Sequence, residues 1–405
     1  MSVSAIALRY GPIVAPLLTV DEAQAEVLAR CRPLDSEPVP LDEAAGRISA
    51  DAARAQVDLP PFPSSAMDGY AVRTADVPGA LTLVGRIAAG RPAERALAAG
   101  EAMEISTGGV VPEGADAVAP VETVTVRGDE VEVPERLEPG THVRPRGGDV
   151  RAGDVVVAAG VRLAATQLGA LAAAGVAEVA CALRPRVVVL ATGSELVQPG
   201  TPLAPGQVYE ANALMLASAI ASVGADVERL PAVADDERAH RAAIERGLEA
   251  DVLVTSGGVS VGPHDLVRRV EAELGVEEVF WGVAVKPGKP VAFGVRGRTL
   301  VFGLPGNPVS SLVGCELFVK PALRALQGLA DPLPRFERGR LASSLRQNAT
   351  RDELVRARIE DGALAPLTGQ ESHMIARAAA ANALVHVPRG EGTLDAGAEV
   401  RWLRL

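Results

Sequence analysis

Two lysines, Lys286 and Lys289, lie three residues apart in the segment "VAVKPGKPVAFG", within a turn rich in proline and glycine. The chain has forty Lys plus Arg residues but only three lysines, so arginine is its usual positive residue. A lysine ammonium is a compact, strongly hydrated point charge, whereas the guanidinium of arginine is planar. The pair is therefore a candidate anion site, although an isolated lysine pair is more commonly a solvated turn.

Acidic residues and glycines follow predicted strands of the same region. Glu195 follows "RVVVLAT", and Asp235 and Asp236 precede a predicted helix, so that either aspartate is able to cap the helix or to bind a ligand. A second turn, "GGVSVGPHD", follows "DVLVTS" and contains Gly257, Gly258, Ser260 and Asp265. Glycines there allow backbone N–H groups to approach a phosphate, although a glycine-rich turn is equally typical of tight structural turns.

Carboxylates beside an anion site are electrostatically unfavourable unless a divalent cation lies between them. We therefore predict a Mg²⁺ ion bound by Glu195, Asp235 and Asp265, which assists chemistry at a phosphate. The turn is not a Walker loop, because the Lys-Ser/Thr ending is missing. A last turn of this region, "GLPGNPVSSL", contains Pro305 and Pro308, and proline in the first turn of a helix is also an ordinary structural pattern.

Three segments of a β-rich region combine charge with tight turns. Asp68 lies in "PPFPSSAMDGYAVR", and Thr107 lies in "STGGVVPEGADAV". Arg144 and Asp149 lie in "VRPRGGD". Each segment taken singly is typical of a surface turn.

The residues from 184 to about 330 alternate predicted strands and helices. "RVVVLAT" and "DVLVTS" have the pattern of buried strands, and "NALMLASAIASVG" and "DDERAHRAAIERGLEA" have the apolar spacing of helices. Such alternation predicts a parallel sheet with helices on both faces. Ligands of these sheets bind beyond the carboxyl ends of the strands, so we expect the acidic turns and the lysines at one edge.

The remaining residues predict a multidomain α/β plus β protein. We expect residues 16–55 to pair with 150–183 as a helical linker domain, in which a helix begins at a capping box of Thr19 and Glu22. Short valine-rich runs predict an inserted β-rich domain over 56–149. Residues 331–405 predict a small β-barrel-like domain.

Charge and composition exclude several classes of protein. The formal net charge of −11 opposes nonspecific binding to nucleic acid or to an anionic membrane. Cys31, Cys181 and Cys315 lie far apart without a metal-binding spacing, which indicates buried thiols in a reducing compartment. Arg9 and prolines interrupt the N-terminal apolar stretch, so we predict neither a signal peptide nor a membrane span, and a cytoplasmic protein.

From about residue 17 to its end, the chain resembles the molybdopterin molybdenumtransferase family, which includes the bacterial MoeA proteins and the E domain of gephyrin. The resemblance is carried by "SAMDGYAVR", "PEGADAV", "VRPRGGD", "ATGSEL", "SGGVSVGPHD", "KPGKP" and "GLPGNPVS", in the order of the family. It implies an elongated four-domain homodimer with a MogA-like molybdopterin-binding α/β domain. In that dimer the linker domain contributes to dimerisation.

The resemblance also implies an activity, the insertion of molybdate into adenylylated molybdopterin with release of AMP and molybdenum cofactor. It assigns Glu195, Asp235 and Asp265 to the pterin nucleotide and its metal. Further residues implied to bind substrate are Gly257, Gly258, Ser260, Lys289, Pro305, Pro308 and, in "GQESHMI", Ser372. The residues implied to be catalytic are Glu195, Asp265, Lys286 and Asp68. The resemblance also implies that the cleft is completed from the other subunit by Asp68, Thr107, Arg144 and Asp149. Gly148 and Gly282 depart from the charged residues common in the family, which bears on anion affinity.

Two other functions fit parts of the sequence. The α/β region also looks like a molybdopterin adenylyltransferase, which would use ATP without molybdate, and the family implies at least transient contact with such an enzyme. A scaffold that binds a peptide, as the gephyrin E domain also is, belongs to a different class. The sequence distinguishes neither molybdate from tungstate nor Mg²⁺ from other divalent ions.

Overall fold

The computed structural model describes residues 17–259 and 266–405, which form two compact units. The larger unit contains the described residues up to Asp35 together with Ala182–Leu405. The smaller unit contains Ser36–Cys181, so it is inserted between two segments of the larger one.

A six-stranded sheet forms the centre of the larger unit, in the order β16-β13-β17-β21-β20-β18. Its parallel strands are β16 (Asp226–Arg229), β13 (Arg186–Ala191), β17 (Val252–Ser256) and β21 (Thr299–Leu304). The antiparallel strands β20 (Ala292–Arg296) and β18 (Glu277–Trp281) complete one side. The middle parallel strands are almost entirely buried, which explains their continuous apolar runs.

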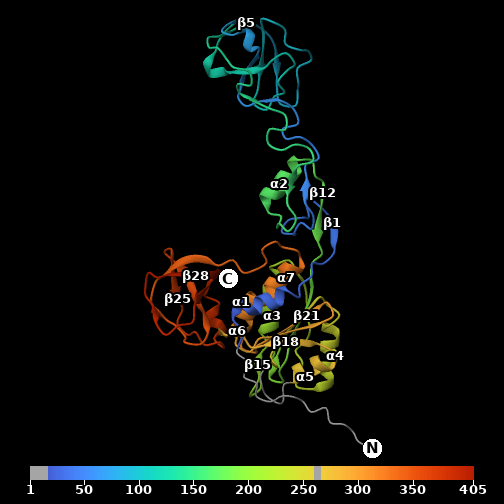
Figure 1. Cartoon of the computed structure of the whole chain (residues 1–405), viewed down its shortest axis with the longest axis vertical. Coiled ribbons are helices and arrows are strands. Elements are labelled where there is room, and N and C mark those ends of the chain that lie inside the picture. Colours follow the sequence, from blue (N-terminus) through green and yellow to red (C-terminus); the bar gives the residue numbers. More distant parts are fainter. Residues whose placement is uncertain (1–16, 260–265) are drawn as a thin grey trace, which may run out of the picture. The chain divides into compact units, whose positions relative to one another are not determined.

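Helices cover both faces of this sheet, as predicted (Figure 1). Val187 and Val189 of β13 pack with α3 (Asn212–Ala221), α6 (Pro308–Gly314), α7 (Lys320–Leu326) and α1 (Val20–Leu28). Val188 and Leu190 point to the other face and pack with α4 (Glu237–Gly247) and α5 (Leu266–Glu273). The alternation of side chains along one strand therefore divides the core into two layers.

Local signals in the sequence account for several helix ends. The predicted capping box is present, because Thr19 Oγ1 accepts from Glu22 N and the Glu22 carboxylate accepts from Thr19 N. Gly175 follows α2 (Ala165–Ala173) with a φ of 81°, where other residues are strained. Between α6 and α7, Cys315–Val319 form a π-helical turn whose Leu317 carbonyl accepts a bond from the buried Gln24 amide.

The C-terminal region closes into a five-stranded barrel, in agreement with the barrel-like prediction. Its strands are β22 (Glu337–Leu341), β24 (Asp352–Glu360), β25 (Ala363–Pro366), β26 (Ala383–Val387) and β28 (Glu399–Arg404). Pairing of β24 with β26 closes the ring around a core that includes Trp402. The short strand β19 (Val285–Lys286), which belongs to the α/β region, adds to β24 in parallel.

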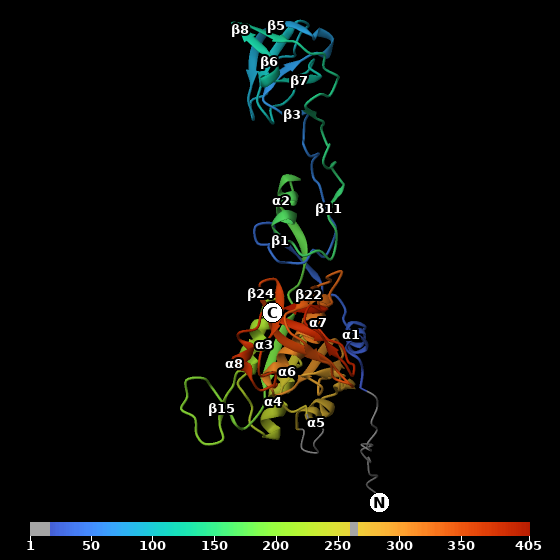
Figure 2. The same cartoon turned by 90° about the vertical axis from the view of Figure 1, so that its left-hand side faces the viewer.

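The smaller unit contains a second six-stranded sheet, in the order β7-β4-β6-β5-β9-β8 (Figure 2). Its strands are β4 (Gly69–Val72), β5 (Gly79–Ile87), β6 (Glu101–Ile105), β7 (Ala117–Pro120), β8 (Thr125–Arg127) and β9 (Glu130–Val133). Elsewhere in the chain, β1 (Ser36–Pro40) pairs with β12 (Glu178–Ala182), and β2 (Ala53–Arg54) pairs with β11 (Val155–Val157).

One packing prediction was wrong. We expected the helix that begins after Thr19 to pack with residues 150–183, but α1 packs on α7 and the π-helical turn in the larger unit. The reason is the apolar face of α1, since Ala23 and Val27 are fully buried against the core of the α/β region. Amphipathic spacing alone indicates that a helix has a buried face, but not which partner covers it.

The cysteines are free thiols, as expected. Cys181 and Cys315 are buried and Cys31 is partly buried. Burial raises the pKa of Cys315 to about 12, so this thiol stays protonated and unreactive at neutral pH. Among the described residues, no helix has the length and apolar character needed to cross a membrane.

We expect Gly69→Ala to destabilise the smaller unit by about 2 kcal/mol or more, because its methyl group would lie 2.1 Å from the Ala119 carbonyl oxygen of the adjacent strand. Gly85→Ala is a matched control in the same sheet, where the nearest atom, Met103 Cγ, is 4.0 Å away. We expect the control to change stability by no more than about 0.5 kcal/mol. Circular dichroism should follow the unfolding, because both tryptophans, Trp281 and Trp402, lie in the larger unit. Equal stability of the two variants would contradict the close contact.

Candidate active site

Three parallel strands of the larger unit end at the same level. Ala191 of β13 is the register partner of Ser256 in β17, and Ser256 is the partner of Leu304 in β21. The turns that follow these strands therefore lie at one edge of the sheet, as the α/β pattern predicted. Thr192 continues the register by pairing with Val233, which brings in the turn before α4.

The acidic residues of this edge are organised by Ser194. Its hydroxyl donates to Asp235 Oδ2 at 3.0 Å, and the Asp235 N–H is 2.9 Å from Ser194 Oγ. Glu195 folds over Gly193, where an added methyl group would lie 2.6 Å from Glu195 Oε2. Glu195 and Asp235 are thus exposed carboxylates on two turns that are tied together through one serine.

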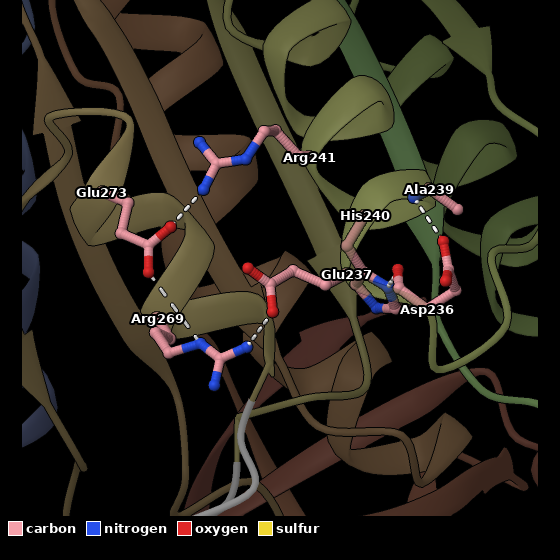
Figure 3. A network of polar contacts seen from close by, with 7 residues as sticks. All are labelled: Asp236, Glu237, Ala239, His240, Arg241, Arg269 and Glu273. Carbon is pink, nitrogen blue, oxygen red and sulfur yellow. Dashed lines mark hydrogen bonds and ion pairs between the residues drawn. The ribbon is translucent and has the colours of Figure 1, made fainter.

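Asp235 and Asp236 make different contacts at the start of α4. Asp236 caps this helix, because its Oδ1 accepts from Ala239 N at 2.8 Å. The buried His240 ring lies 2.9 Å from the Asp236 carbonyl oxygen (Figure 3). Asp235 is therefore the aspartate that is directed to the edge of the sheet.

Ion pairs hold α4 against α5 beside this turn (Figure 3). Arg241 pairs with Glu273, and Arg269 bonds to Glu237 at 2.6 Å. Exposed pairs are individually weak, but this pair of contacts joins two helices that flank the acidic turn. It thereby limits how far the start of α4 is able to move relative to α5.

Ser260 and Asp265 lie outside the described residues, which omit 260–265. Within the described ranges, 17–259 and 266–405, no group of three or more His, Cys, Asp or Glu side chains is arranged to hold a metal. Glu195 and Asp235 are the predicted metal ligands that the structure describes, and both supply hard oxygen donors.

The two glycines after β17 are explained by close packing. A methyl group on Gly257 would lie 2.7 Å from the Thr192 carbonyl oxygen, and one on Gly258 would lie 2.3 Å from Val267 Cγ2. The Gly257 N–H donates to the Leu304 carbonyl at 3.0 Å. This N–H group therefore makes a hydrogen bond within the protein, whereas the sequence had suggested that it binds a phosphate.

The lysine turn lies beside the first turn of α6. Lys286 Nζ is 2.8 Å from Glu353 Oε1 of β24, and Lys289 is exposed. A methyl group on Gly288 would lie 3.4 Å from the Ser310 carbonyl oxygen. The two ammonium groups thus come from a turn that packs closely on the loop after β21.

Several bonds fix the loop that contains Pro305 and Pro308. Ser311 Oγ donates to the Pro305 carbonyl, and Asn212 Nδ2 donates to the Gly306 carbonyl at 2.7 Å. Val309 N donates to the carbonyl of Ser372 at 3.0 Å. Ser372, a residue of the C-terminal region, is therefore placed at the start of α6.

Sequence reasoning missed the residue that shapes the Ser372 loop. Arg356 of β24 is 1% exposed, and its guanidinium donates to the carbonyls of Gly369, Glu371 and Met374. Desolvation lowers the pKa of Arg356 from its ordinary value. The sequence did not indicate that Arg356 is buried, because its strand contains three other arginine or glutamate residues. The burial of Arg356 depends on the loop that folds over it.

The structure brings together a second group in the smaller unit. Asp68 Oδ1 accepts from Thr107 N at 2.6 Å and from Thr107 Oγ1 at 3.0 Å, and these two bonds lower the pKa of Asp68. Arg144 is the strand partner of Ser64. Ser64 lies three residues before Met67, in the same short segment as Asp68. Asp68, Thr107 and Arg144 thus belong to one cluster of turns, held by Ser65, which bonds to Gly108 and Gly109.

Asp149 makes a different set of contacts in the smaller unit. Its N–H donates to the Leu59 carbonyl at 2.9 Å, next to the ion pair of Arg146 with Asp58. Among the described residues, no hydrogen bond or ion pair joins Asp149 to Asp68, Thr107 or Arg144. The described site residues of the larger unit therefore lie on turns along one edge of its sheet, and those of the smaller unit lie on turns of that unit.

Three family models match successive parts of the chain. Residues 18–175 match the MoeA N-terminal region (domain I and II), and residues 188–325 match a probable molybdopterin-binding domain. Residues 338–405 match the MoeA C-terminal region (domain IV). Both groups of site residues lie within these matched segments.

Curated relatives cover nearly the whole chain. Molybdopterin molybdenumtransferase 2 of Mycobacterium tuberculosis is 38% identical over 394 residues, which cover 93% of this chain and 96% of the relative. The molybdopterin molybdenumtransferase of Haemophilus influenzae is 40% identical over 317 residues, which cover 77% of this chain and 78% of the relative.

Solved structures show the same fold. A molybdopterin biosynthesis MoeA protein from Pyrococcus horikoshii has a TM-score of 0.84 at 28% identity and covers 96% of this chain and 100% of its own. A second structure of such a protein from that genus has a TM-score of 0.81 at 32% identity, covering 96% of this chain and 99% of its own. Sequence and fold agree over nearly the full length, and the chain belongs to the molybdopterin molybdenumtransferase (MoeA) family.

Proposed function

We propose that this chain is a molybdopterin molybdenumtransferase, which transfers molybdenum from molybdate to adenylylated molybdopterin and releases AMP. The observation that carries the proposal is that an acidic turn pair and a lysine turn lie along one edge of the parallel sheet. One end of that edge suits a cation-bound nucleotide phosphate, and the other suits a tetrahedral oxyanion.

The nucleotide phosphate is assigned to the acidic end. Glu195 and Asp235 would hold Mg²⁺ there, with Asp265 as the third carboxylate, because carboxylate oxygens are the donors that this ion prefers. When bound, the ion lowers the cost of negative charge on the departing phosphate. Ser194 keeps Asp235 directed to this position through the two hydrogen bonds that join them.

Molybdate is assigned to the basic end. It is a tetrahedral dianion, and ammonium groups, hydroxyls and backbone N–H groups are suitable donors. Lys286 and Lys289 belong to a turn that packs on α6, and the Ser372 carbonyl accepts from Val309 at the start of that helix. Asn212 bonds to the loop before α6, and the buried Arg356 bonds to the loop of Ser372. The sulfur ligands of molybdenum come from the pterin dithiolene, so the enzyme has no need of a cysteine cluster.

Residues of the smaller unit serve the same reaction in this proposal. Asp68, Thr107, Arg144 and Asp149 would complete the cleft from the second subunit of a homodimer. We also propose that the protein works in the cytoplasm and receives its labile substrate through transient contact with a molybdopterin adenylyltransferase.

The activity is tested with purified protein, adenylylated molybdopterin, molybdate and Mg²⁺. We expect AMP release that requires molybdate, together with a product that activates an apo-molybdoenzyme. Formation of adenylylated molybdopterin from ATP without molybdate would instead identify an adenylyltransferase. Replacing molybdate with tungstate in the same assay measures the preference between the two anions.

We expect Lys286→Ala and Glu195→Gln each to lower kcat/KM roughly a hundredfold, because each removes one charge that stabilises the reacting anions. Arg298→Ala is the matched control, since Arg298 is exposed in the hairpin between β20 and β21, at the opposite end of β21. The control should retain wild-type turnover. Wild-type turnover in either site variant would remove that residue from the mechanism.

Thr107→Val should raise the pKa of Asp68, because it removes the hydroxyl bond and leaves the backbone bond. A lowered folded-state pKa gives stability that is present above the unfolded pKa and is lost as pH falls through the folded value. The variant should therefore lose this contribution at a higher pH than the wild type. Carbon-13 NMR titration of the Asp68 carboxyl measures the shift, with Thr107→Ser as control. An unchanged Asp68 titration in Thr107→Val would contradict the conclusion that the Thr107 hydroxyl lowers the pKa of Asp68.

Mixed dimers test the shared cleft. If one site combines the larger unit of one subunit with the smaller unit of the other, Lys286→Ala and Asp68→Ala chains are inactive separately. Their equimolar mixture should then recover about a quarter of wild-type activity, because half of the dimers are mixed and each has one intact site. No recovery after subunit exchange would show that each site is made from a single chain.

A further inference from the structure

Lys286 is already paired in the protein by itself. Its Nζ lies 2.8 Å from Glu353 Oε1, and strand pairing fixes the contact, because Lys286 of β19 is the register partner of Glu353 in β24. The Lys286 side chain is 52% exposed, whereas that of Glu353 is 16% exposed. The Lys286 side chain is therefore partly exposed to solvent, whereas the Glu353 carboxylate that pairs with it is largely buried.

Glu353 is held in place by its own strand end. Asn348 Nδ2 donates to Glu353 Oε1 at 3.3 Å, so one carboxylate oxygen receives both Lys286 and Asn348. Asn348 is fixed in turn, since its Oδ1 accepts from the backbone N–H groups of Thr350 and Arg351. The carboxylate is thus presented to Lys286 by a structured turn.

The second lysine of the turn differs. No acidic side chain lies within ion-pair distance of Lys289 among residues 17–259 and 266–405, whereas Lys286 has Glu353. Within the described part of the chain, a dianion that approaches the turn therefore meets one ammonium without an acidic partner and one that is already neutralised. An anion that binds Lys286 also comes close to the Glu353 carboxylate. Because both groups are negatively charged, they repel each other.

We propose that Glu353 is a positioning residue that holds Lys286 in the substrate-free protein and yields it to the incoming oxyanion. The proposal rests on the role of Lys286 in the proposed function. An oxyanion must then break the ion pair between Lys286 and Glu353 when it binds Lys286. The free energy of this ion pair therefore lowers the affinity of the site for every oxyanion. Weakly bound anions such as sulfate and phosphate are kept out, and molybdate binds when the pterin substrate adds its own contacts.

The test is the equilibrium dissociation constant of molybdate, and separately of sulfate, for the free protein, measured by equilibrium dialysis. Glu353→Gln removes the charge and keeps the shape and a hydrogen-bond acceptor for Lys286. We expect it to tighten binding of both anions roughly two- to fivefold, the size of one partly exposed ion pair. A variant that had merely lost structure would bind anions more weakly, so a gain in affinity separates the two roles.

The matched control is Glu360→Gln at the other end of β24. Glu360 is an exposed glutamate that pairs with Arg358 at 3.5 Å, away from the lysine turn. We expect it to leave both dissociation constants unchanged. Circular dichroism checks folding, and Glu353→Thr, which suits a strand and also removes the charge, replaces Glu353→Gln if that variant does not fold.

The scarcity of lysine provides a direct readout. Lysine labelled with carbon-13 at Cε gives three signals in this chain, from Lys286, Lys289 and Lys320, and Lys286→Arg identifies the first. During a molybdate titration, the Lys286 signal should reach its midpoint at a lower concentration in Glu353→Gln than in the wild type.

The outcomes separate this inference from the proposed function. The role of Glu353 is overturned if Glu353→Gln binds anions no more tightly than the wild type and the midpoint of its Lys286 signal in the molybdate titration is unchanged. If Lys286→Gln also leaves anion binding unchanged, Lys286 does not bind the anion, and its role in the proposed function fails together with that of Glu353. Weaker binding by Lys286→Gln and tighter binding by Glu353→Gln establish both roles.

Discussion

The site depends on the register of three parallel strands. Ala191, Ser256 and Leu304 are aligned as successive partners, so the chain leaves the sheet at one level three times. Each following turn is then fixed by a close contact or a bond to its neighbour, as Gly257 shows by packing against Thr192 and bonding to Leu304. A slip of one residue in any strand would invert its buried faces as well as displace its turn, and the two-layer core prevents this.

Strand order separates the opposite charges along that edge. The carboxylates follow β13 and precede α4, whereas the lysines precede β20, and β17 and β21 lie between these strands. With strands about 4.8 Å apart, β13 and β20 are separated by roughly 14 Å. In the function proposed above, that distance would accommodate an extended substrate with a nucleotide phosphate at one end and the metal-accepting dithiolene at the other. It also keeps the acidic residues from neutralising the lysines directly.

The C-terminal barrel is part of the site because of its hydrogen bonds with the α/β region. Strand β24 supplies both Glu353, which pairs with Lys286, and the buried Arg356, which shapes the loop of Ser372. The carbonyl of Ser372 then accepts from Val309 at the start of α6. One strand thus contacts both the lysine turn and the loop of Ser372, through two residues that lie three positions apart.

Periodic and local signals in the sequence determined much of the fold. The alternation of apolar strands and helices predicted the parallel sheet, and Thr19 with Glu22 predicted the start of α1, because these features depend on residues close together in the chain. The placement of Glu195, Lys286, Pro305 and Pro308 at one edge followed from the same pattern together with the family motifs. Whether Asp235 or Asp236 caps α4, the packing partner of α1, the burial of Arg356 and the pairing of Lys286 with Glu353 were decided only by tertiary structure. These four features join residues that are distant in sequence or compete for the same role, and the free energy that selects among them comes from contacts that form only when the chain is folded.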